Sequence, residues 1–544
     1  MSIIRKIMDQ WSFLFKGKSA MAAGTQRLPK KFFLIFYCAA LIISILAVYS
    51  QVLSYPRYSP EWSLFYFWNY NLSLKDIIAL YNPFLVSFGQ YFYRPTAFVT
   101  FYQLVTPFID WHNIAGFQVL GVIMLAINSV FIYYFTRQLF KDEITPLLTS
   151  LLSFIHPVFF ILIHNLFMTD FLYQFFLLWF CIIFCGNFLE RKKAFPWIAI
   201  AMFLYLLAVT SKEQAIGLPV FLAGFLILEF LFNRTTVATG NALFRNRLVL
   251  TLMVIIITII YIAIFLSRVQ ESFSSGEYRI GLNPAIIINN IVSGFLWLFH
   301  VFKFPNKTWP LFRVHSTNAN NIYGLMVLAA VFYYGAIIVI RKERDEIRKL
   351  LGLLFFIAAF MMLPVYSGGR PWHFALPAVA VMMLYARFVS RLLEKARNRT
   401  VAVAALCIIV IVPMTLSAIN FSRDMNRVDE AFKLNSEALL HPPLPGSSIP
   451  KGSTIAYYPA EAKWLYGCGH MFSFVYARND INEIPVPDII AITPEAALDL
   501  YSKANLYYFE YDRSREPRWQ DKSTEFKARL LDKIPPGKRP RGVR

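Results

Sequence analysis

Long apolar runs separated by short polar segments dominate the first 420 residues of the chain. Most of these runs hold about 18 residues or more, the length that a helix needs to cross the apolar core of a bilayer. We therefore predict about 11 transmembrane helices. The predicted spans lie at 32–53, 114–135, 145–163, 171–189, 194–210, a sixth that ends before Arg234, 248–266, 322–340, 350–365, 374–389 and 401–419.

Two longer polar regions interrupt this pattern and are predicted to form outer loops, at 54–111 and 268–320. The first contains aromatic amphipathic stretches, which favour helices lying in the membrane interface. The second contains an apolar stretch at 285–302. If that stretch spanned the membrane, the basic segment that begins at Arg341 would move to the outer side. Because basic loops stay inside, we expect an interfacial helix or hairpin there.

The chain after residue 420 has a different pattern. Strand-like runs at 454–458, 488–492 and 506–509 alternate with helix-compatible segments such as 494–503. This alternation predicts a small α/β domain. The sequence thus divides into an N-terminal cytoplasmic segment (1–31), a membrane domain (32–419), an extracytoplasmic α/β domain (420–532) and a basic disordered tail (533–544).

Composition agrees with a polytopic membrane protein. The 544 residues are 57% hydrophobic and 17% aromatic, with a mean hydropathy of +0.50. The net charge of +21 comes from basic loops on one side of the predicted membrane, since the segment after 420 is nearly neutral. The charge is therefore an orientation signal, and nucleic-acid binding is not expected. The five cysteines show no disulfide or zinc pattern, and the first apolar run is too long for a cleaved signal peptide.

Ionisable residues beside apolar segments are the strongest functional signal, because such groups are costly near a bilayer. The predicted topology places eight of them near its outer face. They are Glu61, Arg94, His164, Asp170, Lys212, Glu213, Arg370 and His373. Two kinds of group in this set, carboxylates and strong cations, favour a site for an anionic substrate attached to a lipid.

Each of these residues has a possible catalytic or binding role and also a purely structural explanation. Glu61 can accept a proton from a hydroxyl nucleophile, although Asp76 and Asp110 compete for that role and an interfacial acid is equally expected. Arg94 can clamp a phosphate or reach lipid headgroups as an anchor. Arg370 follows two glycines that allow close approach to a ligand, and it also suits a plain tight turn.

The tight hairpin between the fifth and sixth spans should direct its charges toward protein or a cavity. Lys212 is expected to neutralise phosphate, and Glu213 to orient the phosphate, to hold an arginine or to cap a helix. His156 and His164 lie eight residues apart, and an interfacial histidine bonded to a sugar hydroxyl is expected in preference to a metal ligand. The alternative that His156 and His164 have only a structural role stays open.

Several of these segments resemble those of a known superfamily. Tyr93-Arg94-Pro95-Thr96, His156-Pro157 and Ser211-Lys212-Glu213-Gln214 are similar, in order and spacing, to motifs of GT-C membrane glycosyltransferases. The O-mannosyltransferase-like branch, whose eukaryotic members carry tetratricopeptide repeats, is the most similar. The run from Arg370 through His373 to Pro377 resembles a late-helix feature of bacterial members. The repeats are absent here, and only Glu61 stands where the family shows an acidic pair.

The resemblance implies a GT-C-like fold and an inverting transfer of a sugar from a polyprenyl-phosphate donor to a glycan, lipid or protein acceptor on the outer side. In this reading Glu61 and Asp170 are catalytic and Arg94, Lys212 and Arg370 bind the donor phosphate. The substrate-binding residues are His156, His164, Glu213 and His373. The scheme requires no cofactor and leaves a divalent metal open.

Other functions stay open at this stage. One is an oligosaccharyltransferase or O-antigen ligase that moves a whole glycan, and another is a transporter or flippase of lipid-linked sugar. A transporter predicts repeated halves and ionisable groups at the bilayer midplane, which the sequence does not show. A bacterial inner membrane is the expected location. The sequons at Asn71 and Asn306 keep the endoplasmic reticulum as an alternative.

Overall fold

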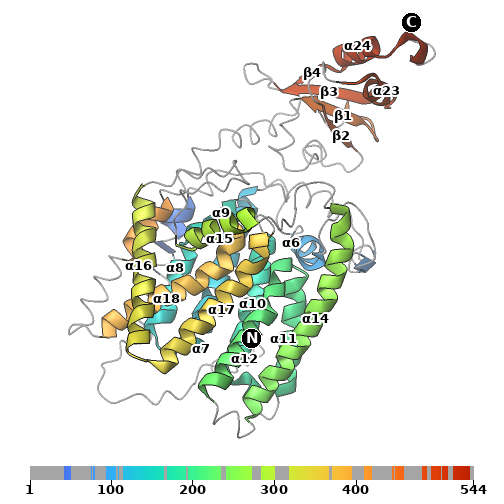
Figure 1. Ribbon diagram of the computed structural model, residues 1–544. Helices are drawn as coiled ribbons and strands as arrows, with labels where there is room; N and C mark the ends of the chain where they lie inside the picture. The colour runs from blue at the N-terminus through green and yellow to red at the C-terminus, as the bar shows by residue number, and fades with distance from the viewer. Residues whose placement is uncertain are drawn as a thin grey trace.

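The computed structural model shows a helical bundle with a small sheet beyond one end of it (Figure 1). We call the end of the bundle beside the sheet the sheet end, and the other the loop end. The structure describes residues 39, 42–43, 45–50, 75, 78–79, 82, 94–105, 108, 114–164, 168–190, 194–233, 241–272, 284–299, 318–366, 371–394, 410–419, 444–445, 448–458, 481–486, 492–503, 505–511 and 519–539.

Six of the described helices are long and apolar enough to cross a membrane, or up to seven if one bent pair forms a single span. They are α7 (Ile114–Phe140), α12 (Leu218–Phe232, preceded by the turn η4, Glu213–Gly217), α14 (Ala242–Ser272), α16 (Asn318–Ile340), α17 (Arg344–Tyr366) and α18 (Ala375–Glu394). The bent pair is α8 (Ile144–Phe154) with α9 (Pro157–His164), at 48°.

Shorter apolar helices complete the bundle: α10 (Met168–Cys185), α11 (Ala194–Val209) and α15 (Pro284–Leu298), together with a described stretch at 410–419. The multi-pass architecture predicted from sequence is confirmed. The predicted spans between 114 and 389 fall on these helices, with 145–163 on the bent pair, and the span 401–419 is described only from residue 410. The first span, 32–53, is described only in part, around η1 (Ile45–Tyr49). There the Tyr49 hydroxyl donates to the carbonyl of Phe154 at 2.6 Å.

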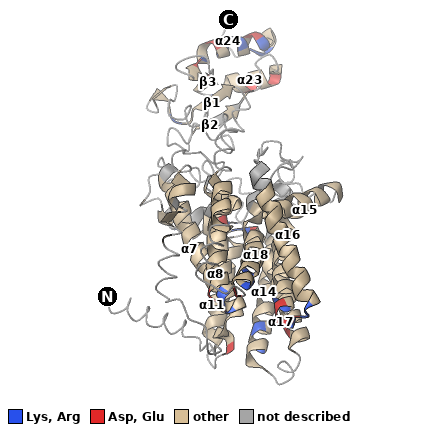
Figure 2. Cartoon of the chain, turned by 90° about the vertical axis from the view of Figure 1, so that its left-hand side faces the viewer, with Lys and Arg blue, Asp and Glu red and all other residues tan. Residues whose placement is uncertain are grey.

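The apolar stretch at 285–302 forms α15, which has 15 residues. That length is below the roughly 20 residues a spanning helix needs. Figure 2 shows α15 at the sheet end, extending sideways from the bundle. This placement agrees with the interfacial helix predicted from the charge of the following loop.

Helix α18 lies at the centre of the bundle and α16 at its edge. In the most apolar window of α18, 83% of the residues are buried by protein, against 28% in α16. Helix α18 packs against α8, α16 and α17. An edge helix with an exposed apolar surface is the normal arrangement where lipid, rather than water, surrounds the protein.

The C-terminal region forms a four-stranded sheet in the order β2-β1-β3-β4. The strands are β1 (Thr454–Tyr458), β2 (Asn482–Pro485), β3 (Leu506–Tyr511) and β4 (Trp519–Asp521). Strand β1 runs parallel to β2 and β3, while β4 is antiparallel to β3. The helices α23 (Pro494–Ser502) and α24 (Ser523–Lys533) pack with this sheet through a separate apolar cluster.

The α/β character of this region and the segments β1, β3 and α23 match the sequence prediction, whereas β2 and β4 were not predicted. The predicted strand 488–492 lies almost entirely outside the described residues. The prediction of a disordered tail from 533 was wrong as far as Arg539. Ile534 is 1% exposed in the apolar cluster of the sheet and holds the start of that segment in place.

Candidate functional site

A buried ion pair joins Arg94 to Glu213 at the end of α11. The guanidinium donates from Nε to Oε2 at 2.8 Å and from Nη2 to Oε1 at 2.6 Å. The side chains are only 8% and 11% exposed. This two-point geometry is the strongest kind of contact that an arginine makes with a carboxylate. It fixes both the position and the plane of the guanidinium.

The segment that carries Arg94 is also held by its backbone. After Pro95, the Thr96 amide donates to the carbonyl of Thr210 at 3.2 Å. The two threonine hydroxyls lie 2.7 Å apart in a hydrogen bond. The short helix η2 (Thr96–Phe101) begins there. The Arg-Pro-Thr motif is therefore attached to the last residues of α11, beside the Ser-Lys-Glu-Gln motif that follows.

A second buried pair joins Lys212 to Asp170, the third residue of α10. The Lys212 ammonium donates to Asp170 Oδ2, and the two side chains are 3% and 0% exposed. The same ammonium lies 6.0 Å from the centre of the Tyr173 ring. Asp170 Oδ1 has no hydrogen-bond partner among the described residues. One oxygen of this carboxylate thus remains available to a ligand.

The local fold explains why adjacent residues serve different pairs. Helix α11 ends at Val209, and the amides of Ser211 and Lys212 both return to the carbonyl of Ala208. Lys212 then adopts an extended backbone before η4 begins. Successive side chains of an extended segment point in opposite directions. Lys212 therefore reaches α10, while Glu213 reaches the Arg94 segment.

The turn η4 is pressed against α17. A Cβ atom on Gly217 would lie 2.3 Å from the carbonyl oxygen of Ala359. Only glycine permits this distance, because the neighbouring atom belongs to a helix backbone that cannot move aside. The Lys212-Glu213 segment is thus held between α10 on one side and α17 on the other.

The two ion pairs lie well below the end of the bundle. The Asn128 amide nitrogen on α7 donates to the carbonyl of Phe171, the residue after Asp170, at 3.1 Å. Asn128 lies 14 residues into α7, or about 21 Å of helix at 1.5 Å per residue. Both helices run from the sheet end toward the loop end (Figure 1). The start of α10, with Asp170, is therefore recessed relative to the start of α7.

His156 occupies the bend between α8 and α9. Its Nδ1 accepts a hydrogen bond from the Val158 amide at 3.2 Å, which caps the first turn of α9. Its Nε2 lies 3.3 Å from the carbonyl of Leu298, at the end of α15. Since Nδ1 accepts, Nε2 carries the proton and donates. His156 thus connects the bend to α15, and a contact with substrate stays a prediction.

Of the remaining predicted residues, the structure describes the side chain of His373. His373 lies in the turn η7 (Pro371–Phe374), and its carbonyl accepts from the Gln214 side chain at 3.5 Å, the limit for such a bond. This contact places η7 beside η4. The side chain of His164, and all of Glu61 and Arg370, lie outside the described residues. Their predicted roles are untested.

Buried amide side chains were missed in the sequence analysis. Gln174 lies one helical turn beyond Asp170 and is 0% exposed. Tyr173 interacts with it, yet neither amide atom makes a hydrogen bond with ordinary geometry among the described residues. Gln214 Oε1 likewise has no described partner. A polar residue inside an apolar span is itself a signal, and Gln174 could have been found on that ground.

The structure brings together Arg94, Asp170, Lys212 and Glu213, which come from three segments far apart in the sequence. Asp170 also interacts electrostatically with Arg94 and Glu213. Two of the three cations predicted for phosphate, Arg94 and Lys212, therefore already have carboxylate partners among the described residues. Among the described residues, no group of three or more His, Cys, Asp or Glu side chains has the arrangement of a metal site.

Comparison with known proteins gives a fold but no family. No family model and no curated protein matches the chain. Among solved structures, it is similar to the oligosaccharyltransferase of Archaeoglobus fulgidus tethered with an acceptor peptide containing the NVT sequon. The identity is 14%, the TM-score is 0.50, and the match covers 93% of this chain and 68% of that one. This likeness shows that the chain shares its fold with that oligosaccharyltransferase.

Two further structures match less closely. The oligosaccharyltransferase AglB from Archaeoglobus fulgidus, in complex with an inhibitory peptide and a dolichol-phosphate, has 14% identity and a TM-score of 0.49, covering 89% of this chain and 69% of that one. ArnT from Cupriavidus metallidurans, bound to undecaprenyl phosphate, has 10% identity and a TM-score of 0.45, covering 89% and 94%.

Proposed function

We propose that this GT-C-fold protein transfers a sugar from a polyprenyl-phosphate donor to an acceptor hydroxyl, at the recessed site formed by Arg94, Asp170, Lys212 and Glu213. One observation carries the proposal. Two cations and two carboxylates are buried at the ends of α10 and α11, where unpaired charge would be costly. Such an arrangement suits a reaction in which negative charge moves onto a phosphate.

The chemical step is a single inverting displacement. The acceptor oxygen forms a bond to the anomeric carbon of the sugar as the bond from that carbon to the polyprenyl phosphate breaks. The acceptor proton goes to a carboxylate, for which Glu61 stays our prediction. The phosphate leaves with one additional negative charge. Arg94 and Lys212, together with Arg370 as predicted from sequence, would stabilise that charge as it develops.

The paired carboxylates set how many charges the site can accept. Arg94 and Lys212 are balanced by Glu213 and Asp170, so the described set is neutral. A sugar phosphodiester brings one negative charge and a diphosphate donor brings two, while the sequence predicts one further cation, Arg370, and one further carboxylate, Glu61. A monophosphate donor therefore leaves less negative charge without a cation, and we propose it as the substrate.

Asp170 and Gln174 are our candidates for recognition of the sugar. Asp170 Oδ1 and the Gln174 amide lie on one face of α10, one turn apart, and make no hydrogen bond of ordinary geometry among the described residues. Sugar hydroxyls supply the donors and acceptors that such groups need. We expect Gln174→Leu to raise the KM for the donor about tenfold, the effect of losing one or two hydrogen bonds of about 1.4 kcal/mol in total. An unchanged KM would contradict this role.

The test of the proposal uses membranes that contain the full chain. Membranes with the wild-type protein, with Lys212→Met or with the double variant Lys212→Met/Asp170→Asn are incubated with polyprenyl-phosphate-linked radiolabelled hexoses and pentoses, and label in the acceptor fraction is measured. Transfer by the wild type, and its loss both in Lys212→Met and in the double variant, which removes both charges of the buried pair, support the proposal. Equal transfer by the wild type and either variant would refute it. The expected bacterial inner membrane, and a C-terminal domain on the outer side, stay predictions.

A second function has support from the fold alone. The neighbour with a TM-score of 0.50 is an oligosaccharyltransferase, so transfer of a whole glycan from a lipid diphosphate is the rival. Incubating the same membranes with a polyprenyl-diphosphate oligosaccharide separates the two. Transfer from the diphosphate donor and not from the monophosphate donors would favour the rival.

A further inference from the structure

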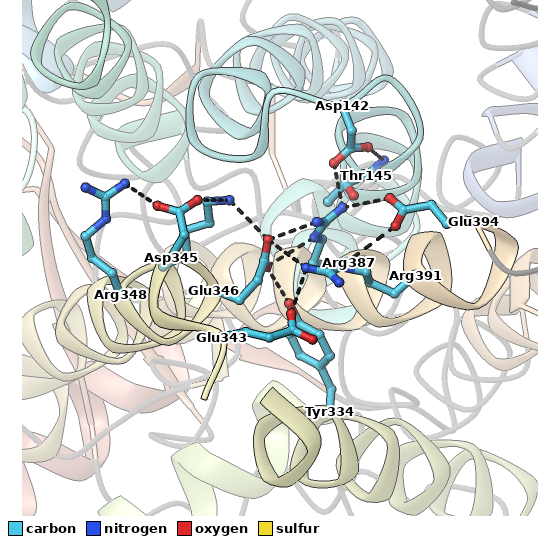
Figure 3. Close-up of polar contacts among 11 residues, drawn as sticks. Asp142, Thr145, Tyr334, Glu343, Asp345, Glu346, Arg348, Arg387, Arg391 and Glu394 are labelled. Atoms are coloured by element: carbon cyan, nitrogen blue, oxygen red, sulfur yellow. Dashed lines mark hydrogen bonds and ion pairs between the residues drawn. The ribbon is translucent and has the colours of Figure 1, made fainter. Parts of the chain in front are cut away.

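A network of ion pairs joins four helices at the loop end of the bundle (Figure 3). Arg387 of α18 lies at its centre. The guanidinium donates to Glu346 of α17 at 2.9 and 3.2 Å, and to Asp142 in the α7–α8 turn at 3.2 Å. The Tyr334 hydroxyl of α16 donates to the same Glu346 at 2.7 Å. Arg387 and Glu346 are 8% and 6% exposed.

Other carboxylates of this region also form ion pairs with cations of the same protein. Arg391 contacts Glu343 and Glu346 at 3.0 and 3.1 Å. Lys349 pairs with Asp345 at 2.9 Å and with Glu346 at 3.1 Å. Most carboxylates of the α7–α8 turn, the α16–α17 turn and the start of α17 are therefore paired with cations on α17 and α18.

Several cations on the same two turns point outward and have no such partner. Lys141 in the α7–α8 turn, and Arg341, Lys342 and Arg344 in the α16–α17 turn, are all exposed, and none of them forms an ion pair among the described residues. The one nearby carboxylate without a described ion pair, Glu143, is partly buried. The other carboxylates near these turns thus have cation partners, although Asp345 and Glu394 are 65% and 41% exposed, whereas four exposed cations have no ion-pair partner among the described residues. We call these four residues the cationic rim.

Two of the rim lysines occupy backbone positions that favour glycine. Lys141 and Lys342 follow the last turns of α7 and α16 with φ of 58° and 54°. A residue in this left-handed conformation at a helix end is most often glycine. A lysine there is less stable by about 1 kcal/mol. Both turns thus carry a lysine where glycine would give a more stable backbone. We take this as a sign that the ammonium groups have a function.

An exposed apolar surface adjoins the rim. Val339 and Ile340, the last residues of α16, are 56% and 77% exposed, and Phe332 of the same helix is 63% exposed. In a membrane protein this surface contacts acyl chains. Cations placed directly at the end of such a surface lie at the level of the lipid headgroups.

We infer that the cationic rim and the end of α16 form a binding site for an anionic glycerophospholipid. The headgroup phosphate would lie among Arg341, Lys342 and Arg344, and the acyl chains along Val339 and Ile340. A soluble anion would use the cations but not the apolar surface. Lys141 follows the end of α7 and lies 13 residues beyond Asn128, the residue that contacts the start of α10, or about 20 Å of helix. The site is therefore separate from Asp170 and Lys212 and independent of the proposed transfer reaction.

The test measures lipid binding to the full chain by native mass spectrometry after delipidation in detergent, with dioleoylphosphatidylglycerol and dioleoylphosphatidylcholine as probes. Arg341→Gln/Lys342→Gln/Arg344→Gln removes three rim charges from exposed residues. Lys527→Gln/Arg529→Gln/Lys538→Gln removes three exposed charges from the C-terminal domain and is the matched control. Size-exclusion chromatography and the thermal midpoint establish that each variant is folded.

We expect phosphatidylglycerol to bind the wild type and the control with equal affinity, and the rim variant at least tenfold more weakly. Phosphatidylcholine should bind all three alike and weakly. Three results would overturn the inference: rim and wild-type affinities within twofold, equal loss in the control, or equal binding of the two lipids to the wild type.

Discussion

The Lys212–Asp170 pair allows a prediction that separates stability from chemistry. Lys212→Met removes the ammonium and leaves a carboxylate that is 0% exposed without its counterion. Breaking a buried pair by removing one partner costs about 3–5 kcal/mol, because the remaining charge is uncompensated. We therefore expect the free energy of unfolding of Lys212→Met to fall by that amount.

The double variant Lys212→Met/Asp170→Asn should recover most of the loss. Replacing both charges removes the uncompensated carboxylate, so the expected coupling free energy between the two sites is about 2 kcal/mol or more. The assay is unfolding by SDS in mixed micelles, followed by tryptophan fluorescence. Lys503→Met is the matched control. Lys503 forms an exposed pair with Asp499 at 3.0 Å, and such pairs contribute about 0.5 kcal/mol or less.

Activity provides the second measurement on the same proteins. If Asp170 and Lys212 contact the donor, the double variant will be stable and inactive in sugar transfer. If the pair only supports the fold, transfer will return with stability. A loss below about 1 kcal/mol in Lys212→Met, or zero coupling in the cycle, would refute the reasoning from burial.

Two further predictions concern packing and charge elsewhere in the bundle. Gly217→Ala should lower the free energy of unfolding by about 1–3 kcal/mol, because its Cβ would lie 2.3 Å from a carbonyl oxygen. Gly335→Ala, where the nearest atom is 3.7 Å away, should instead stabilise α16 by about 0.5–1 kcal/mol. Arg387→Met should cost about 1.5–3 kcal/mol, since Glu346 loses its two charged hydrogen bonds from Arg387 but keeps Lys349 and Arg391. Arg348→Met, in a pair that is 30% and 65% exposed, should cost below about 1 kcal/mol. The SDS assay measures all four, and a similar loss in both members of either comparison would contradict the corresponding argument.

Hydrophobic pattern was sufficient to locate the helices, because a bilayer imposes a long apolar run on every span. The predicted span 322–340 corresponds to α16 and the predicted span 194–210 to α11. The pattern could not give the 48° bend at His156-Pro157. The bend depends on His156 capping α9 and contacting the end of α15, which are tertiary contacts.

The candidate site was predicted as a set of residues but not as a set of contacts. Glu213 holding an arginine was one of the roles expected from sequence, and its partner is Arg94, 119 residues away. The pairing of Lys212 with Asp170 was not predicted, since spacing along a chain does not determine which charges meet across helices. From the sequence, Lys212 was expected to neutralise phosphate, and Arg94 to clamp phosphate or to anchor at lipid headgroups. The structure adds that each has a carboxylate partner before any substrate binds.

The sequence separation of these pairs has a consequence for biosynthesis. Chains are synthesised at about 5–20 residues per second. Lys212 follows Asp170 by 42 residues, so Asp170 enters its apolar helix roughly 2–8 seconds before its counterion exists. Arg94 precedes Glu213 by 119 residues, an interval of about 6–24 seconds. During insertion these early charges require water, a proton or the insertion machinery as temporary partners. The site is therefore assembled from its charges only when the hairpin after α11 has been made, with more than half of the chain still to follow.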